Sequence, residues 1–229
     1  MGVIGDRTRA PADVSELRIA VNEPSRSALL LIDVQRDFCA GGALAVPGAE
    51  AILPRLNDLI AYFRKHNAPV YASRDWHPLD TRHFANQGGQ WPMHCVAGTT
   101  GAQFHPELGL PGDVIVVSKG QTATADGYSA FDGTNPAGEP LLQDLQSRQV
   151  ARLVVGGLAT DYCVRQSVIA AYEAGLDVSV VTDAIAGVEL NTGDSQRALE
   201  AMRAVGARLT RSDDLLEHAF PDAGTGFGS

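Results

Sequence analysis

The chain has 229 residues, 45% of them hydrophobic and 20% charged, which is enough apolar material for one domain with its own core. Its formal net charge of −9 argues against a nucleic-acid partner, because phosphate backbones are bound by clustered basic residues. No apolar run approaches the roughly 18 residues of a membrane span, so no membrane partner is expected. The first residues form no apolar signal segment, and three cysteines are too few for a disulfide framework. These features favour a cytoplasmic protein of enzyme size.

Short apolar runs alternate with longer helical patterns along most of the chain. Residues 1–27 are expected to form an N-terminal extension, residues 28–220 a single domain and residues 221–229 a flexible tail. Strands are predicted at 28–33, 69–73, 113–118, 152–157, 177–183 and 207–210, and helices at 49–66, 140–148, 161–174 and 191–205. Several strand runs are continuously apolar and rich in Val, Leu and Ile, as is typical of parallel strands covered on both faces. The pattern predicts an α/β fold.

The segment 74–112 is long, irregular and rich in His, Pro and Gly, and loops of this length within a domain are usually functional. It contains Asp75, His77, His83 and His94 in the spacing D-x-H-x5-H-x10-H. One carboxylate and three imidazoles suit Zn²⁺, Mn²⁺ or Fe²⁺. The alternative is a polar loop with surface histidines. We expect the neighbouring Cys95 to be a core thiol rather than a soft ligand.

Three polar residues lie where predicted strands end and should share one edge of the sheet, where ligands bind in open parallel sheets. They are Asp33, Lys119 and Cys163. Cys163 falls in the first turn of a predicted helix capped by Thr160 or Asp161, where the helix dipole and a nearby lysine favour a thiolate. Asp33 could accept the thiol proton and pass it to a leaving group, while backbone N–H groups of this turn stabilise an oxyanion. Taken singly, each residue has a structural explanation, as a turn former, a solvated lysine and a small buried thiol.

Five segments carry further information: ALLLIDVQRDFCAGGALAVPGAE (28–50), SRDWHPLDTRHF (73–84), WPMHCVAGTTGAQFHPEL (91–108), SKG (118–120) and VVGGLATDYCV (154–164). Together they resemble the nicotinamidase/pyrazinamidase family of the isochorismatase-like cysteine hydrolases. The resemblance implies a three-layer α/β/α fold around a six-stranded, mainly parallel sheet. By position, the resemblance implies a catalytic triad of Asp33, Lys119 and Cys163, and an oxyanion hole formed by Ala159 and Cys163 beside a cis peptide after Leu158. It implies a substrate pocket lined by Phe38, Trp91, Tyr128 and Leu158. The implied metal ligands are Asp75, His77, His83 and His94.

The same resemblance implies the hydrolysis of nicotinamide to nicotinate and ammonia through a thioester on Cys163, with pyrazinamide as a second substrate. One divalent metal ion is implied, with zinc or iron favoured over manganese. An amidase for carbamoyl or maleamate-type substrates shares the Asp, Lys and Cys but usually lacks the full metal cluster. An isochorismatase proper does not use the cysteine. A non-catalytic metal or thiol sensor remains the alternative from another class, and the oligomeric state is left open.

Overall fold

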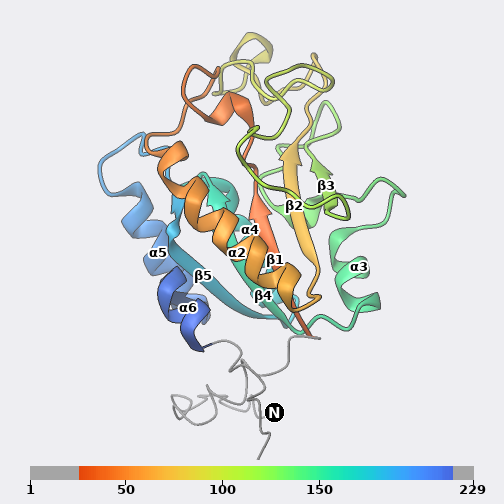
Figure 1. The fold of residues 1–229 in the computed structure, drawn as a ribbon. Helices are drawn as coiled ribbons and strands as arrows, with labels where there is room; N and C mark the ends of the chain where they lie inside the picture. Colours follow the sequence, from red (N-terminus) through yellow and green to blue (C-terminus); the bar gives the residue numbers. More distant parts are fainter. Residues whose placement is uncertain (1–25, 219–229) are drawn as a thin grey trace, which may run out of the picture.

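The computed structural model describes residues 26–218 (Figure 1). This part of the chain contains six strands and five α-helices, besides short 3-10 helices and one π-helical turn. The strands are Ser27–Ile32 (β1), Val70–Asp75 (β2), Ile115–Lys119 (β3), Arg152–Leu158 (β4), Asp177–Ala186 (β5) and Arg208–Thr210 (β6). The helices are Leu53–Lys65 (α2), Leu141–Ser147 (α3), Arg165–Glu173 (α4), Asp194–Val205 (α5) and Ser212–His218 (α6). Every predicted strand and helix is present, and α6 is a short helix that the apolar pattern did not indicate.

The strands pair in the order β3-β2-β1-β4-β5-β6, and every pairing between them is parallel. Side chains of β1 alternate between the two faces of the sheet, so that Leu29 and Leu31 join one apolar cluster while Leu30 and Ile32 join the other. Both faces are therefore covered, which explains the continuously apolar strand sequences.

Helices α2 and α6 contribute to the first cluster, and helices α3, α4 and α5 to the second. Figure 1 shows α2 lying across the near face of the sheet. The molecule thus has the expected three layers, α/β/α.

The direction of strand addition reverses between β1 and β4, and a crevice for ligands forms at such a switch point. Gly157 of β4 lies beside Ile32 of β1 with φ +129°, and a Cβ there would come within 2.2 Å of the Ile32 carbonyl oxygen. A glycine is therefore required for the two strands to pair closely at this point. The long connection between β2 and β3 gathers at the same end of the sheet, above the carboxyl ends of the strands (Figure 1).

The proposed extension and tail fall mostly on residues 1–25 and 219–229, outside the described residues, and stay predictions; Ser27 already belongs to β1. Across residues 26–218, each helix is too short or too polar to cross a bilayer.

Candidate active site and metal centre

The carboxyl ends of four neighbouring strands supply the polar side chains at the centre of the site. Lys119 ends β3, Asp75 ends β2, Asp33 follows β1, and Cys163 lies in the turn after β4. All four side chains are buried. One carboxylate oxygen of each aspartate and Sγ of Cys163 lie within 4.8 Å of one another. The fold therefore brings together the three residues predicted as a catalytic triad and adds Asp75 to them.

Lys119 connects these groups, and it is one of only two lysines in the chain. Its Nζ lies 2.8 Å from Asp33 Oδ2, forms an ion pair with Asp75 Oδ1, donates to the Gly127 carbonyl at 2.8 Å and lies 3.6 Å from Cys163 Sγ. Burial alone would lower the pKa of Lys119, but the two carboxylates outweigh it and hold that pKa well above its ordinary value. The ammonium is therefore charged at neutral pH.

Cys163 differs from the expectation of a preformed thiolate. Its complete burial raises the pKa of the thiol well above the ordinary value, and Lys119 only partly opposes this effect. Burial also raises the pKa of the Asp33 carboxyl, with Lys119 again acting in the opposite direction. The prediction from the helix dipole was wrong because it omitted desolvation and the two nearby carboxylates. A protonated thiol beside a carboxylate needs that carboxylate as its base.

Two buried side chains that sequence reasoning missed hold the aspartates in place. Ser73 Oγ donates to Asp33 Oδ1 at 2.7 Å. The side-chain amide of Gln35 forms two hydrogen bonds with the main chain of Asp75. It accepts from the Asp75 N–H at 2.8 Å and donates to the Asp75 carbonyl at 2.8 Å. Neither residue carries a local signal, because a serine in a strand and a glutamine after one are ordinary. Only the pairing of β1 with β2 brings them to these partners.

The turn that carries Cys163 is a π-helical turn, Thr160–Val164, leading directly into α4. Such turns often occur at functional sites. Asp161 does not cap it as predicted: its carboxylate accepts the N–H groups of Val188 and Glu189, at 2.9 and 2.8 Å. Thr160 does not cap it either, since the N-cap position is Ala159 and no side chain bonds there.

The peptide bond before Ala159 was expected to be cis, but no peptide bond within residues 26–218 is cis. Ala159 instead has φ 59° and ψ 64°, in the left-handed region that non-glycine residues rarely adopt. Its carbonyl accepts from the N–H groups of Tyr162 and Val164, which closes the π-helical turn. Leu158, expected beside the substrate, is fully buried in the apolar cluster on the α2 side of the sheet.

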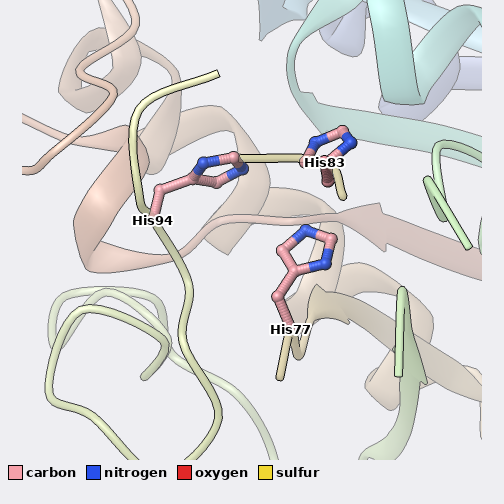
Figure 2. A group of neighbouring side chains, drawn as sticks. All are labelled: His77, His83 and His94. Atoms are coloured by element: carbon pink, nitrogen blue, oxygen red, sulfur yellow. The ribbon is translucent and has the colours of Figure 1, made fainter. Parts of the chain in front are cut away.

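Three imidazoles, from the loop between β2 and β3, converge on one another (Figure 2). One ring nitrogen each of His77, His83 and His94 lies within 4.8 Å of the other two, and all three residues are buried. Asp75 Oδ2 lies 3.7 Å from His77 Nε2 and 3.9 Å from His94 Nε2. The loop achieves this by folding back on itself, with the His77 N–H donating to the Cys95 carbonyl at 3.0 Å. Cys95 itself is a buried core thiol, as expected.

The chemistry of this donor set fits a divalent metal ion. His77 Nε2 is buried and has no hydrogen-bond partner among the described residues, which is costly unless the nitrogen has a ligand. Burial lowers the pKa of His83, and it lowers the pKa of His94 to about 4, so both rings are neutral as metal ligands must be. Asp75 is ionised, because Lys119 and the histidines overcome the effect of burial and hold its pKa well below its ordinary value.

Each imidazole is oriented through its other nitrogen, the usual arrangement around metal-binding histidines. Nδ1 of His77 lies 3.1 Å from the Gly120 carbonyl, Nδ1 of His83 lies 3.3 Å from Asp126 Oδ1, and Nδ1 of His94 lies 2.7 Å from the Pro92 carbonyl. Gly120 has φ +64°, and a Cβ at this position would lie 2.4 Å from His77 Cε1. The glycine that follows Lys119 is therefore needed for His77 to occupy its position.

Aromatic side chains surround the metal-ligating group. The Phe38 ring lies 5.4 Å from that of His94, and Trp91 Nε1 donates to the Tyr128 hydroxyl at 2.9 Å. Tyr162, which was not predicted, packs edge-on against Trp91 with ring centroids 4.9 Å apart. Its position next to Cys163 in the chain was the available signal.

The site geometry agrees with comparisons to known proteins. The isochorismatase domain family matches residues 27–214. A nicotinamidase/pyrazinamidase of Mycobacterium tuberculosis is 40% identical over 188 residues, covering 81% of this chain and 98% of that protein. The chain belongs to the nicotinamidase/pyrazinamidase family.

Solved structures of this family have the same fold. The pyrazinamidase of Pyrococcus horikoshii in complex with zinc superposes with a TM-score of 0.75 at 37% identity, covering 81% of this chain and 99% of that one. PnC1 from L. infantum in complex with nicotinate superposes with a TM-score of 0.75 at 33% identity, covering 84% of this chain and 96% of that one. The resemblance read from the five sequence segments is thus confirmed.

Proposed function

We propose that this protein is a metal-dependent amidase that hydrolyses nicotinamide to nicotinate and ammonia, and pyrazinamide to pyrazinoate in the same way. The observation that carries this proposal is the buried chain of contacts from Cys163 through Lys119 and Asp75 to the three histidines. It joins a thiol and its acid–base partner to a cluster suited to a metal ion. The relatives named as nicotinamidases and pyrazinamidases support the same substrate class.

In the first half-reaction Asp33 removes the proton from Cys163, and the sulfur attacks the carboxamide carbon. The N–H groups of Ala159 and Cys163 are the proposed donors to the oxyanion that forms. Asp33 then delivers its proton to the amide nitrogen, the C–N bond breaks and ammonia leaves, with the acyl group held as a thioester.

In the second half-reaction Asp33 deprotonates a water that attacks the thioester carbon. The C–S bond breaks, Asp33 returns its proton to the sulfur, and the acid product loses its proton to solvent and leaves as nicotinate. Lys119 holds Asp33 in place throughout, and its charge stabilises the anionic forms of Asp33 and Cys163 in turn.

Asp75, His77, His83 and His94 would hold the metal ion, and a bound ion supplies a Lewis-acidic contact that orients a pyridine nitrogen or lowers the pKa of a water. We propose zinc or iron, because three imidazoles and one carboxylate suit either ion. The zinc complex of the Pyrococcus relative supports zinc. Phe38, Trp91 and Tyr128 would pack against the aromatic ring of the substrate and exclude water from it.

Ammonia release from nicotinamide by the purified protein tests the proposal, with Cys163→Ala measured beside it. We expect turnover by the wild type alone, and nicotinate binding by both proteins. Equal turnover by Cys163→Ala would exclude the proposed nucleophile. Turnover of carbamoyl or maleamate-type amides but not of nicotinamide would keep the chemistry and change the substrate. No turnover of any amide by the metal-loaded, folded protein would favour a sensor.

A further inference from the structure

A second group of potential metal ligands lies outside the catalytic machinery. It consists of Cys39, which follows the short 3-10 helix Arg36–Phe38, Glu50 of the short helix Ala49–Ile52, and His105 of the β2–β3 loop. One ligand atom from each residue lies within 4.8 Å of the other two. This cluster shares no residue with the three-histidine group and contains a thiol, which that group does not.

Hydrogen bonds hold the Glu50 carboxylate and the main chain of His105 in place beside Cys39. The Ala40 N–H donates to Glu50 Oε1, which fixes that carboxylate beside Cys39 and leaves the second carboxylate oxygen for another partner. The His105 N–H donates to the Val34 carbonyl at 2.8 Å, which ties the β2–β3 loop to the segment after β1. The cluster is therefore preorganised by contacts that do not depend on an ion.

Burial within the cluster is graded. The Cys39 side chain is buried, His105 is partly buried and Glu50 is exposed. The Glu50 carboxylate is therefore accessible to ions from solvent. Burial and the Glu50 carboxylate raise the pKa of the Cys39 thiol to about 11, so this thiol is neutral at physiological pH without a cation.

We propose that Cys39, Glu50 and His105 bind one thiophilic divalent cation of the zinc class, at a site separate from the catalytic metal centre. A thiolate, an imidazole and a carboxylate are the three ligand types that zinc takes in proteins, and a water completes four-coordination. Calcium and magnesium are disfavoured because they require oxygen ligands.

Binding changes the protonation of two ligands. Cys39 loses its thiol proton to solvent when it coordinates. The Glu107 N–H donates to His105 Nδ1 at 3.2 Å, so coordination through Nε2 transfers the ring proton to Nδ1 and gives up this hydrogen bond. At 3.2 Å the bond is at the long end of the normal range and is a weak competitor. Cation binding at this site should therefore tighten as the pH rises.

The experiment is a Co²⁺ titration of the full chain, carrying Cys163→Ser and first loaded with one equivalent of Zn²⁺. Cobalt bound through a thiolate gives a near-ultraviolet charge-transfer band, and Cys163→Ser removes the thiol of the catalytic site as a source. We expect this band to saturate at one further equivalent and to disappear when Cys39→Ser is added. Glu50→Gln and His105→Asn, at exposed and partly buried positions, each remove a proposed direct ligand and should weaken binding by at least the roughly 10-fold that loss of an outer-shell partner costs.

Glu107→Gln is the matched control, because this exposed carboxylate adjoins the cluster but is not part of it. It should leave the cobalt affinity unchanged. Cobalt uptake without a charge-transfer band, or a band that persists in Cys39→Ser, would overturn the proposal. Neither readout depends on amide turnover, so the result is independent of the proposed enzymatic activity.

Discussion

Lys119→Met tests whether one buried cation holds the catalytic site together. Methionine has a similar length but no charge and no N–H donors, so the substitution leaves Asp33 and Asp75 buried without their shared partner. Removing one member of a buried ion pair destabilises proteins by about 3–5 kcal/mol, because an uncompensated charge remains inside. We expect a loss of this size in the free energy of unfolding at neutral pH, together with loss of amide hydrolysis.

The effect should depend on pH with a defined sign. In the wild type the folded-state pKa of Asp75 lies below its unfolded value of about 3.9, so its contribution to stability is present above that value and is lost as the pH falls towards the folded pKa. In Lys119→Met, burial acts without the lysine and raises the folded-state pKa of both aspartates. The destabilisation should therefore be greatest at neutral pH and should shrink as the pH falls towards about 4.

The assay is urea unfolding at neutral pH and near pH 4.5, with a chelator present so that no bound ion compensates the charge of Asp75. Lys65→Met is the natural control, since Lys65 is the only other lysine and is exposed at the end of α2. A loss below about 1 kcal/mol at neutral pH, or a loss of equal size at both pH values, would refute this account of Lys119.

Three further changes test the surroundings of the site. Ser73→Ala should raise the pKa of Asp33 by about one to two pH units, since a hydrogen bond to a charged group contributes about 1.5–3 kcal/mol. The acidic limb of the pH profile of kcat/KM should move to higher pH by that amount. The control variant Ser118→Ala should leave this profile unchanged. Gly120→Ala should weaken metal binding about 10- to 100-fold, measured by competition with a chelator, and wild-type affinity would contradict the close approach to His77. His77→Ala should lose metal and activity together, and an inactive variant that retains a full equivalent of metal would argue against its role as a ligand.

Local sequence patterns were sufficient for the α/β fold class and for the residues at the centre of the site. Short runs rich in apolar residues predicted all six strands, because strands covered on both faces are mostly apolar. The histidine spacing after β2 indicated a metal centre without knowledge of which side chains contact one another, because histidines are uncommon and were concentrated in one loop. Asp33, Lys119 and Cys163 were recognisable for a similar reason: each lies at or shortly after the end of a predicted strand, and parallel strands end at one edge.

Contacts between distant segments were decided only by the tertiary structure. The strand order β3-β2-β1-β4 brings Ser73 within hydrogen-bond distance of Asp33 and places Lys119 between two aspartates. No local sequence pattern indicates which strands are neighbours. The protonation state of Cys163 could not be predicted either, because it reflects burial and the charges that surround the sulfur rather than its position in a helix. The same holds for Cys39, Glu50 and His105, whose side chains meet although His105 is more than fifty residues from the other two. Sequence determines which groups are available, whereas desolvation and Coulomb interactions depend on distances that exist only once the chain has folded.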